Sequence, residues 1–253
     1  MIVYHIYILC QVIFNDYYIG KTAGKCRAFS RCFVLSCAIL LFMNSDTLRD
    51  RKARFRAILR VLQHLFPVRK TMLVYHNPYE LIISVILSAQ CTDAQVNRVT
   101  PELFKKYPTP EHLAQGKLSD IEKLIFATGF YRIKALRIQS CAKKLVSNFD
   151  GNVPRTTQQL ITLDGVGRKT ANVVLGNAFG IQEGIAVDTH VKRFAIKHNL
   201  TDHTDPNKIE DDLKQIILQK YWTDAAYYMI SYGREICPAR KHNHETCPCT
   251  KFA

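Results

Sequence analysis

Residues 156–190 read TTQQLITLDGVGRKTANVVLGNAFGIQEGIAVDTH, and this stretch decides the fold. Thr156 followed by Gln159 is a capping-box start for a short helix. The Gly-Val-Gly turn at 165–167 ends that helix, because glycine permits a positive φ and lets another backbone approach closely. Apolar residues at helical spacing then predict a second helix from about Arg168. The stretch therefore predicts two helices joined by a glycine hairpin.

The hairpin is suited to hold a nucleic-acid backbone. Its main-chain N–H groups come just before the second helix, and a helix N-terminus favours a bound phosphate. Contacts of this kind fix the position of DNA without reading its base sequence. We predict that Gly165, Val166 and Gly167 donate main-chain N–H groups to a DNA phosphate.

Two residues near the hairpin carry chemistry. Lys169 stands beside the turn, and Asp188 follows nineteen residues later. A neutral lysine amine can attack a sugar carbon and form a Schiff base. A carboxylate can offset positive charge on that sugar and help to move a proton. Taken alone, Lys169 is better explained as a phosphate-binding side chain. Asp188 could also be an ordinary helix N-cap, a role that is compatible with the catalytic one.

The motifs together resemble a known family. LDGVGRKTANVVL at 163–175 followed by AVDTH at 186–190 is similar to endonuclease III, a bifunctional DNA glycosylase and AP lyase of base excision repair. SAQCTDAQVN at 88–97, GFY at 129–131 and GREICPAR at 233–240 belong to the same resemblance. The match extends from about residue 44 to the C-terminus.

Helical periodicity without convincing strand alternation predicts an all-α fold. The resemblance implies the two-domain helix–hairpin–helix DNA glycosylase fold, with a groove between the domains that holds the site. A six-helix barrel domain would span residues 71–181. Residues 44–70 and 182–253 would form a second helical domain from both chain ends, closed by a degenerate iron–sulfur-type loop. Residues 1–43 match nothing in the family, and are either untranslated, with a start at Met43, or a disordered extension.

The resemblance also implies an activity: removal of oxidised pyrimidines through a Lys169 Schiff base, with Asp188 assisting, and a cut 3′ to the abasic site by β-elimination. The damaged nucleotide must leave the duplex for this chemistry. Gln90 would fill the space that it leaves, and Phe130 would be a wedge against the opposite strand, although packing at a helix end explains Phe130 equally well. His190 would be structural or contact a phosphate.

Three alternatives differ in the residues that they need. A non-catalytic helix–hairpin–helix DNA-binding protein would not require Lys169 and Asp188 together. An adenine-type glycosylase of the same superfamily lacks the hairpin lysine. An iron–sulfur electron carrier would need a complete ligand set.

Composition favours a DNA partner in a reducing compartment. The net charge is +14, and the first 43 residues hold only four basic residues and one acidic residue. This excess of positive charge predicts a polyanionic partner such as DNA. The resemblance implies that this partner is double-stranded DNA that contains damaged bases or abasic sites. The scattered cysteines favour a reducing compartment. The apolar run at 32–43 is too short to cross a bilayer as a helix. We expect no membrane association and a monomer in the cytoplasm, associated with the nucleoid if the source is bacterial.

The C-terminal cysteines depart from the family pattern. The family binds a 4Fe–4S cluster through Cys-x6-Cys-x2-Cys-x5-Cys. Cys237 and Cys247 fit the first and third positions, whereas His244 and Ala253 stand at the second and fourth. Cys249 lies out of register. Cys237, His244, Cys247 and Cys249 could hold an altered cluster or zinc, or the loop could bind no metal.

Overall fold

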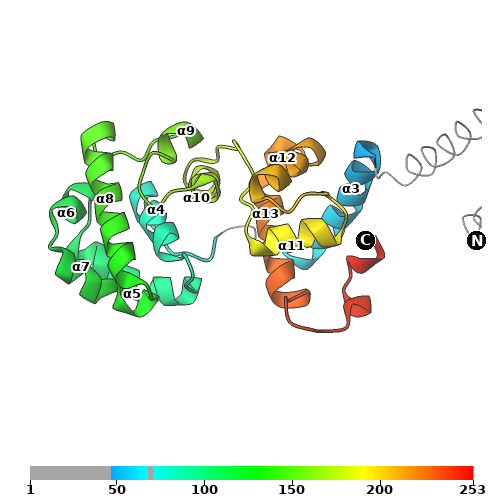
Figure 1. The fold of residues 1–253 in the computed structure, drawn as a ribbon, viewed down its shortest axis with the longest axis horizontal. Helices are drawn as coiled ribbons and strands as arrows, with labels where there is room; N and C mark the ends of the chain where they lie inside the picture. The colour runs from blue at the N-terminus through cyan, green and yellow to red at the C-terminus, as the bar shows by residue number, and fades with distance from the viewer. Residues whose placement is uncertain (1–46, 68–70, 253) are drawn as a thin grey trace, which may run out of the picture. The chain divides into compact units, whose positions relative to one another are not determined.

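The computed structural model describes residues 47–67 and 71–252, which form helices and contain no strand (Figure 1). The α-helices are α3 (Leu48–Leu65), α4 (Pro78–Leu87), α5 (Asp93–Lys106), α6 (Pro110–Gln115), α7 (Leu118–Ile125), α8 (Tyr131–Phe149), α9 (Thr157–Leu160), α10 (Arg168–Val174), α11 (Thr189–Lys197), α12 (Pro206–Ile216) and α13 (Trp222–Ser231). Short 3-10 turns are η1 (Phe126–Thr128), η3 (Gln219–Tyr221), η5 (His244–Thr246) and η6 (Thr250–Phe252). Single π-helical turns are η2 (Leu175–Phe179) and η4 (Tyr232–Ile236). The predicted all-α fold is confirmed.

One hydrophobic core is built around α4. That helix is buried on nearly every side, and α5, α8 and α10 pack against it, while α6 and α7 pack against α8. The buried residues of this core come from positions 73–175. They include the Val166 side chain of the hairpin and Val174 of α10, so the hairpin is fixed to α4 by apolar burial.

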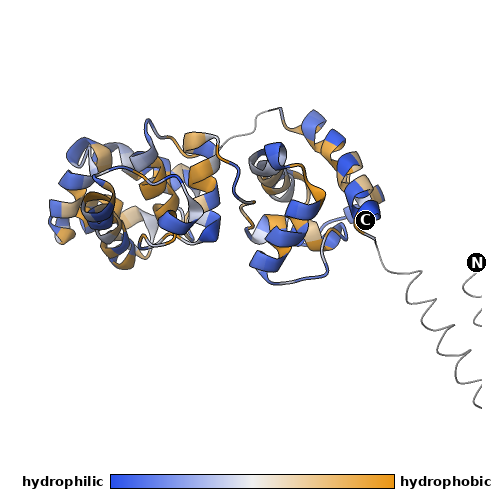
Figure 2. Cartoon of the chain, turned by 90° about the horizontal axis from the view of Figure 1, so that it is seen from above, coloured by the Kyte–Doolittle hydropathy of each residue, from blue (hydrophilic) through white to orange (hydrophobic). Residues whose placement is uncertain are grey.

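A second core joins helices from distant parts of the chain. Helix α3 packs against α12 and α13, and α11 packs against the same two helices. Its buried residues come from positions 55–66 and 185–249. Figure 2 shows hydrophobic residues on the inner faces of both helical groups and hydrophilic residues on the outer faces. The division into domains at residues 71 and 181 stays a prediction, and residues 1–43 lie outside the described part.

The helix cap and the helix start predicted near the hairpin are both present in the structure. The Thr156 side chain accepts a hydrogen bond from the Gln159 N–H at 3.3 Å and so caps α9. Helix α10 begins at Arg168, the predicted residue, directly after Gly167. Within the described residues, no helix combines the length and apolarity needed to span a bilayer.

Candidate active site

The geometry of the hairpin requires glycine at position 165. Gly165 has φ +82°, and a Cβ there would lie 3.2 Å from Ile86 Cγ2 and 3.4 Å from Arg137 Cβ. A residue with a side chain is therefore disfavoured here twice, by these close contacts and by the left-handed backbone that Gly165 adopts. Gly167 is extended, with φ −97°, and a Cβ there would meet nothing within 4 Å. The turn needs Gly165, whereas Gly167 leaves space on the outer side of the hairpin.

The prediction that three hairpin N–H groups face a phosphate is wrong for Val166. Its N–H donates to the Leu163 carbonyl at 3.2 Å, and its side chain is buried. The turn closes on itself through this hydrogen bond, so Val166 has no free N–H. The N–H groups of Gly165 and Gly167 donate to no other described residue.

An open hollow lies beside the hairpin. Its volume is about 600 Å³, and it is lined by Leu136, Arg137, Ser140, Asp164, Gly165, Val166 and Gly167. Asp164 accepts hydrogen bonds from Ser140 and, at 3.1 Å, from Lys144, both on α8. These bonds lower the pKa of the Asp164 carboxyl. The hairpin is therefore held to α8 by polar contacts as well as by its buried apolar side chains.

Lys169 and Asp188 face one another although they belong to different helices. The Lys169 Nζ lies 3.9 Å from the Asp188 Oδ2. The other oxygen, Oδ1, accepts hydrogen bonds from the N–H groups of His190 at 2.8 Å and Val191 at 2.9 Å. Asp188 thus caps α11 with one oxygen and turns the second toward the amine. The cap fixes the orientation of the carboxylate.

The pair lines a cavity of about 350 Å³. The Lys169 side chain is 53% exposed and that of Asp188 is 13% exposed, so the amine is accessible and the carboxylate is sheltered. An ion pair between Arg234 and Asp93, 3.1 Å apart, lies in the cavity wall. The cavity therefore brings an exposed amine, a sheltered carboxylate and the Arg234–Asp93 ion pair to one space.

Glu210 of α12 is a buried carboxylate near the site that the sequence analysis missed. Its buried side chain accepts hydrogen bonds from Asn172 Nδ2 at 2.9 Å and from the Ile185 N–H at 3.2 Å. Its second oxygen accepts from Arg168 Nε at 3.1 Å. A Cβ on Gly184 would lie 2.0 Å from Glu210 Oε1, so this approach requires glycine. Glu210 thus ties α10, which bears Lys169, to the segment that leads to Asp188.

Gln90 and Phe130 share an unusual backbone. Both have left-handed φ values, 52° and 49°, and both side chains are exposed. The Phe130 ring, 65% exposed, is not packed at the helix end, so the packing explanation is wrong. Non-glycine residues in this conformation are uncommon and are enriched at functional sites.

A buried lysine supports the Phe130 loop and was also missed. Lys134 is 3% exposed, and its Nζ donates to the Thr128 carbonyl at 2.7 Å. Burial lowers the pKa of Lys134, and the nearby Cys91 opposes this effect. His190, predicted at the DNA interface, is half-buried. Its Nδ1 lies 3.4 Å from Arg193 Nη2.

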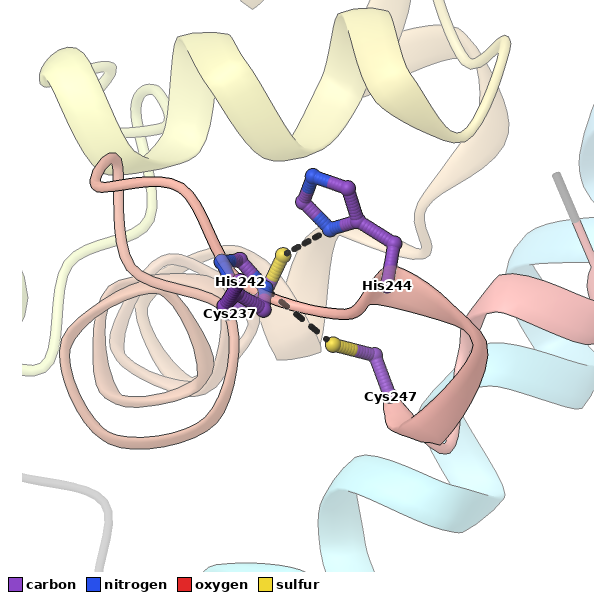
Figure 3. A group of neighbouring side chains, drawn as sticks. All are labelled: Cys237, His242, His244 and Cys247. Carbon is purple, nitrogen blue, oxygen red and sulfur yellow. Dashed lines mark hydrogen bonds between the residues drawn. The ribbon is translucent and has the colours of Figure 1, made fainter.

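Four cysteine and histidine side chains converge at the C-terminus, and they differ from the predicted set (Figure 3). They are Cys237, His242, His244 and Cys247, whose ligand atoms all lie within 4.8 Å of one another. Cys249 is not among them. It is fully buried in the second core, and its N–H donates to the Tyr232 hydroxyl at 3.1 Å. His242 takes the predicted place of Cys249.

The separation of these atoms tests the ligand set against a 4Fe–4S cluster. In such a cluster each protein ligand binds a different iron at the outside of the cube, so the ligands stand far apart. Here the four atoms are as close as ligands that share a single ion, and two are imidazole nitrogens. The described residues do not fit a four-iron cluster. Ala253, at the fourth family position, lies outside the described residues.

Comparison with known proteins shows the family to which the chain belongs. A model of the HhH-GPD superfamily base excision DNA repair proteins matches residues 83–219. Endonuclease III of Synechocystis sp. is 49% identical over 192 residues, which cover 76% of this chain and 88% of the relative.

Two solved structures are also similar. A non-covalent endonuclease III–DNA complex has a TM-score of 0.75 and 41% identity, and the match covers 79% of this chain and 94% of that one. A trapped endonuclease III–DNA covalent intermediate has a TM-score of 0.74 and 42% identity, covering 78% and 93%. The chain therefore belongs to the endonuclease III family, within the HhH-GPD superfamily of base excision DNA repair proteins.

Proposed function

We propose that this chain, a base excision repair DNA glycosylase and AP lyase, removes oxidised pyrimidines with Lys169 as the nucleophile. The observation that carries the proposal is the 3.9 Å approach of Lys169 Nζ to Asp188 Oδ2 in the cavity that both side chains line. A helix–hairpin–helix that only bound DNA would not need a sheltered carboxylate aimed at an exposed amine.

The chemistry follows from these two side chains. The Lys169 nitrogen, once it has lost a proton, bonds to C1′ of the sugar, and the bond from C1′ to the base breaks. The base leaves with the electron pair and takes up a proton. Ring opening gives an iminium between Lys169 and C1′, which makes the C2′ proton acidic. Loss of this C2′ proton is followed by cleavage of the C3′–O bond, which cuts the strand. Water then hydrolyses the Schiff base and releases the lysine.

Asp188 acts on charge and on protons in this scheme. The transition state for base loss carries positive charge on the sugar, as in glycoside hydrolysis. The Oδ2 atom is positioned to stabilise that charge and to accept the proton from Lys169. Because Oδ1 is held by two N–H groups of α11, the carboxylate does not have to reorient during the reaction.

DNA contacts come from three exposed segments. Gln90 fills the space that the extruded nucleotide leaves in the duplex. Phe130 acts as a wedge against the opposite strand. Both side chains are exposed and stand at left-handed backbone positions. The free N–H groups of Gly165 and Gly167 bind a phosphate. His190, whose Nδ1 lies near Arg193 Nη2, helps to hold the DNA backbone near Asp188. The partner is double-stranded DNA with damaged bases or abasic sites.

We infer that the chain acts as a monomer, because one copy contains both members of the catalytic pair and the hairpin. The reducing compartment expected from the cysteines is the cytoplasm, at the nucleoid in a bacterium. The described cysteines are all free thiols, which agrees with that compartment. No reaction step passes through the C-terminal cysteine and histidine group, because Lys169 and Asp188 supply the nucleophile and the proton acceptor.

Borohydride trapping tests the proposal. A duplex with one abasic site is incubated with the full chain and borohydride, which reduces the Schiff base to a stable covalent adduct. The wild-type chain should form the adduct, and Lys169→Ala should not. Lys143→Ala, which changes an exposed lysine of α8, is the matched control and should trap normally. An adduct with Lys169→Ala would mean that another amine is the nucleophile.

The same reaction separates the two other readings of the hairpin. A non-catalytic DNA-binding protein would bind the duplex and give no adduct with any variant. On a second duplex, in which adenine is the target base, an adenine-type glycosylase would release adenine and leave the strand intact. A duplex with one oxidised pyrimidine, compared with the undamaged duplex, measures the substrate class directly.

A further inference from the structure

The C-terminal loop brings two thiols and two imidazoles to one point. The Cys237 Sγ lies 3.7 Å from His244 Nδ1, and the Cys247 Sγ lies 3.4 Å from His242 Nε2 (Figure 3). All four atoms lie within 4.8 Å of one another. The two sulfur atoms come from buried residues, whereas the histidines approach from the more exposed part of the loop.

These separations suit one tetrahedral ion. Zinc bonds of about 2.3 Å to sulfur and about 2.0 Å to nitrogen place neighbouring ligand atoms about 3.3–3.8 Å apart. The two closest pairs, at 3.7 and 3.4 Å, already have this spacing. The remaining pairs, at up to 4.8 Å, need inward movements of only about 1 Å. Two thiolates and two imidazoles are a common structural zinc set.

The positively charged Lys197 side chain contacts two of these four side chains. The Lys197 Nζ, from the last residue of α11, lies 3.2 Å from the Cys237 Sγ and also contacts His244 Nδ1. Two candidate ligand atoms therefore present their lone pairs to a single positive charge. A metal ion would take this place, and Lys197 would move outward while remaining close to the Cys237 sulfur.

The backbone that carries the ligands is held in place. Arg193 Nη2 donates to the Cys237 carbonyl at 3.0 Å and to the Gly233 carbonyl at 2.9 Å. The Cys247 N–H donates to the His244 carbonyl at 3.0 Å, and the Thr250 hydroxyl donates to the same carbonyl at 2.8 Å. The two ends of the loop are thus fixed before any ion binds, as in a preformed site.

We propose that Cys237, His242, His244 and Cys247 hold one structural zinc ion in place of the four-iron cluster of the family. Cys249 is not a ligand in this assignment, because the ligand atoms that lie within 4.8 Å of one another do not include its sulfur. The site closes the C-terminal loop over α11 and leaves no coordination position open for substrate.

Metal analysis of the purified full chain tests this assignment. The protein is produced with both iron and zinc in the medium, purified without oxygen, and analysed for zinc, iron and acid-labile sulfide. We expect about one zinc ion per chain and no stoichiometric iron. Cobalt exchanged into the site should give the visible spectrum of a tetrahedral ion with two thiolate ligands.

Substitutions distinguish this ligand set from the one that the sequence suggested. After dialysis against a chelator, His242→Ala should retain at least about tenfold less zinc than the wild type. Cys249→Ala should retain it. His203→Ala changes an exposed histidine outside the group and is the matched control. His242 is only partly buried, so its loss should leave the fold intact, which the circular dichroism spectrum checks.

Three results would overturn the proposal. Iron and sulfide in equal amounts in the wild type would mean that a cluster forms despite the ligand spacing. Zinc that depends on Cys249 and not on His242 would assign a different set. A wild-type chain without metal, under conditions in which zinc is abundant, would leave the group as a hydrogen-bonded contact around Lys197.

Discussion

The hairpin region and the C-terminal loop are attached to the same helix but differ in what fixes them. Asp188 caps the first turn of α11 and faces Lys169, while Arg193 and Lys197, further along α11, hold the cysteine and histidine loop. The catalytic pair depends on one amine and one carboxylate in a fixed orientation. The loop needs only to be closed, and different ligand sets can close it. Replacement of the metal-binding residues in the loop by others is therefore compatible with an unchanged Lys169–Asp188 pair.

Removing one residue from each region should have very different effects on catalysis. Lys169→Ala should lower the rate of strand cleavage at an abasic site by at least about 10³-fold, because it removes the nucleophile. His242→Ala should lower that rate by no more than about threefold, because the loop takes no part in the chemistry. Single-turnover cleavage at saturating enzyme measures both. A large loss with His242→Ala would show that the loop controls the catalytic pair through α11.

Asp188→Asn separates the two roles of Asp188, the cap of α11 and the charge beside Lys169. Asparagine keeps an oxygen that can cap the helix but loses the charge that faces Lys169. Base release should slow by about 10²–10³-fold, the usual effect of removing one electrostatic group from a transition state. DNA affinity and thermal stability should change little. Equal losses of affinity and rate would mean that Asp188 acts mainly through the fold.

Glu210→Ala tests the tie between α10 and the segment before Asp188. The substitution leaves the Asn172 amide, the Ile185 N–H and the Arg168 guanidinium without their acceptor. We expect the free energy of unfolding to fall by about 3 kcal/mol, less than for a fully buried pair because Arg168 is partly exposed. Urea denaturation measures the loss. Glu183→Ala, at a partly buried carboxylate that accepts from the Thr157 N–H, is the control and should cost less.

His198 gives a smaller, pH-dependent effect next to the loop. Burial, with Lys197 and Arg54 nearby, lowers the pKa of His198 to about 4. Neither of its ring nitrogens has a hydrogen-bond partner among the described residues. The unfolded chain takes up the proton near its ordinary pKa of 6.5, so this stability is complete above pH 6.5 and is lost as the pH falls toward 4.

The difference between wild type and His198→Leu isolates that contribution. Between pH 7 and pH 5 the wild type should lose about 2 kcal/mol more stability than the variant. Urea denaturation at the two pH values, with zinc removed from both proteins, gives the comparison. Equal losses would mean that His198 is protonated in the folded protein.

Sequence patterns predicted the hairpin better than the loop, for a physical reason. The α9 cap, the turn at Gly165 and the start of α10 depend on hydrogen bonds between residues three or four apart. The C-terminal loop has only short 3-10 turns, so spacing alone could not show that His242 turns inward and Cys249 enters the core. The closed N–H of Val166 was missed because a motif records residue types and not hydrogen bonds.

The amino-acid sequence by itself determined the helices, the positive charge, the family and the presence of an amine and a carboxylate near a hairpin. Three contacts became visible only in the folded chain: Asp188 turns one oxygen to Lys169, Glu210 joins α12 to α10, and His242 lies with the other three side chains of the cysteine and histidine group. These contacts join residues on different elements. Their geometry is set by how two hydrophobic cores pack, which no local pattern specifies.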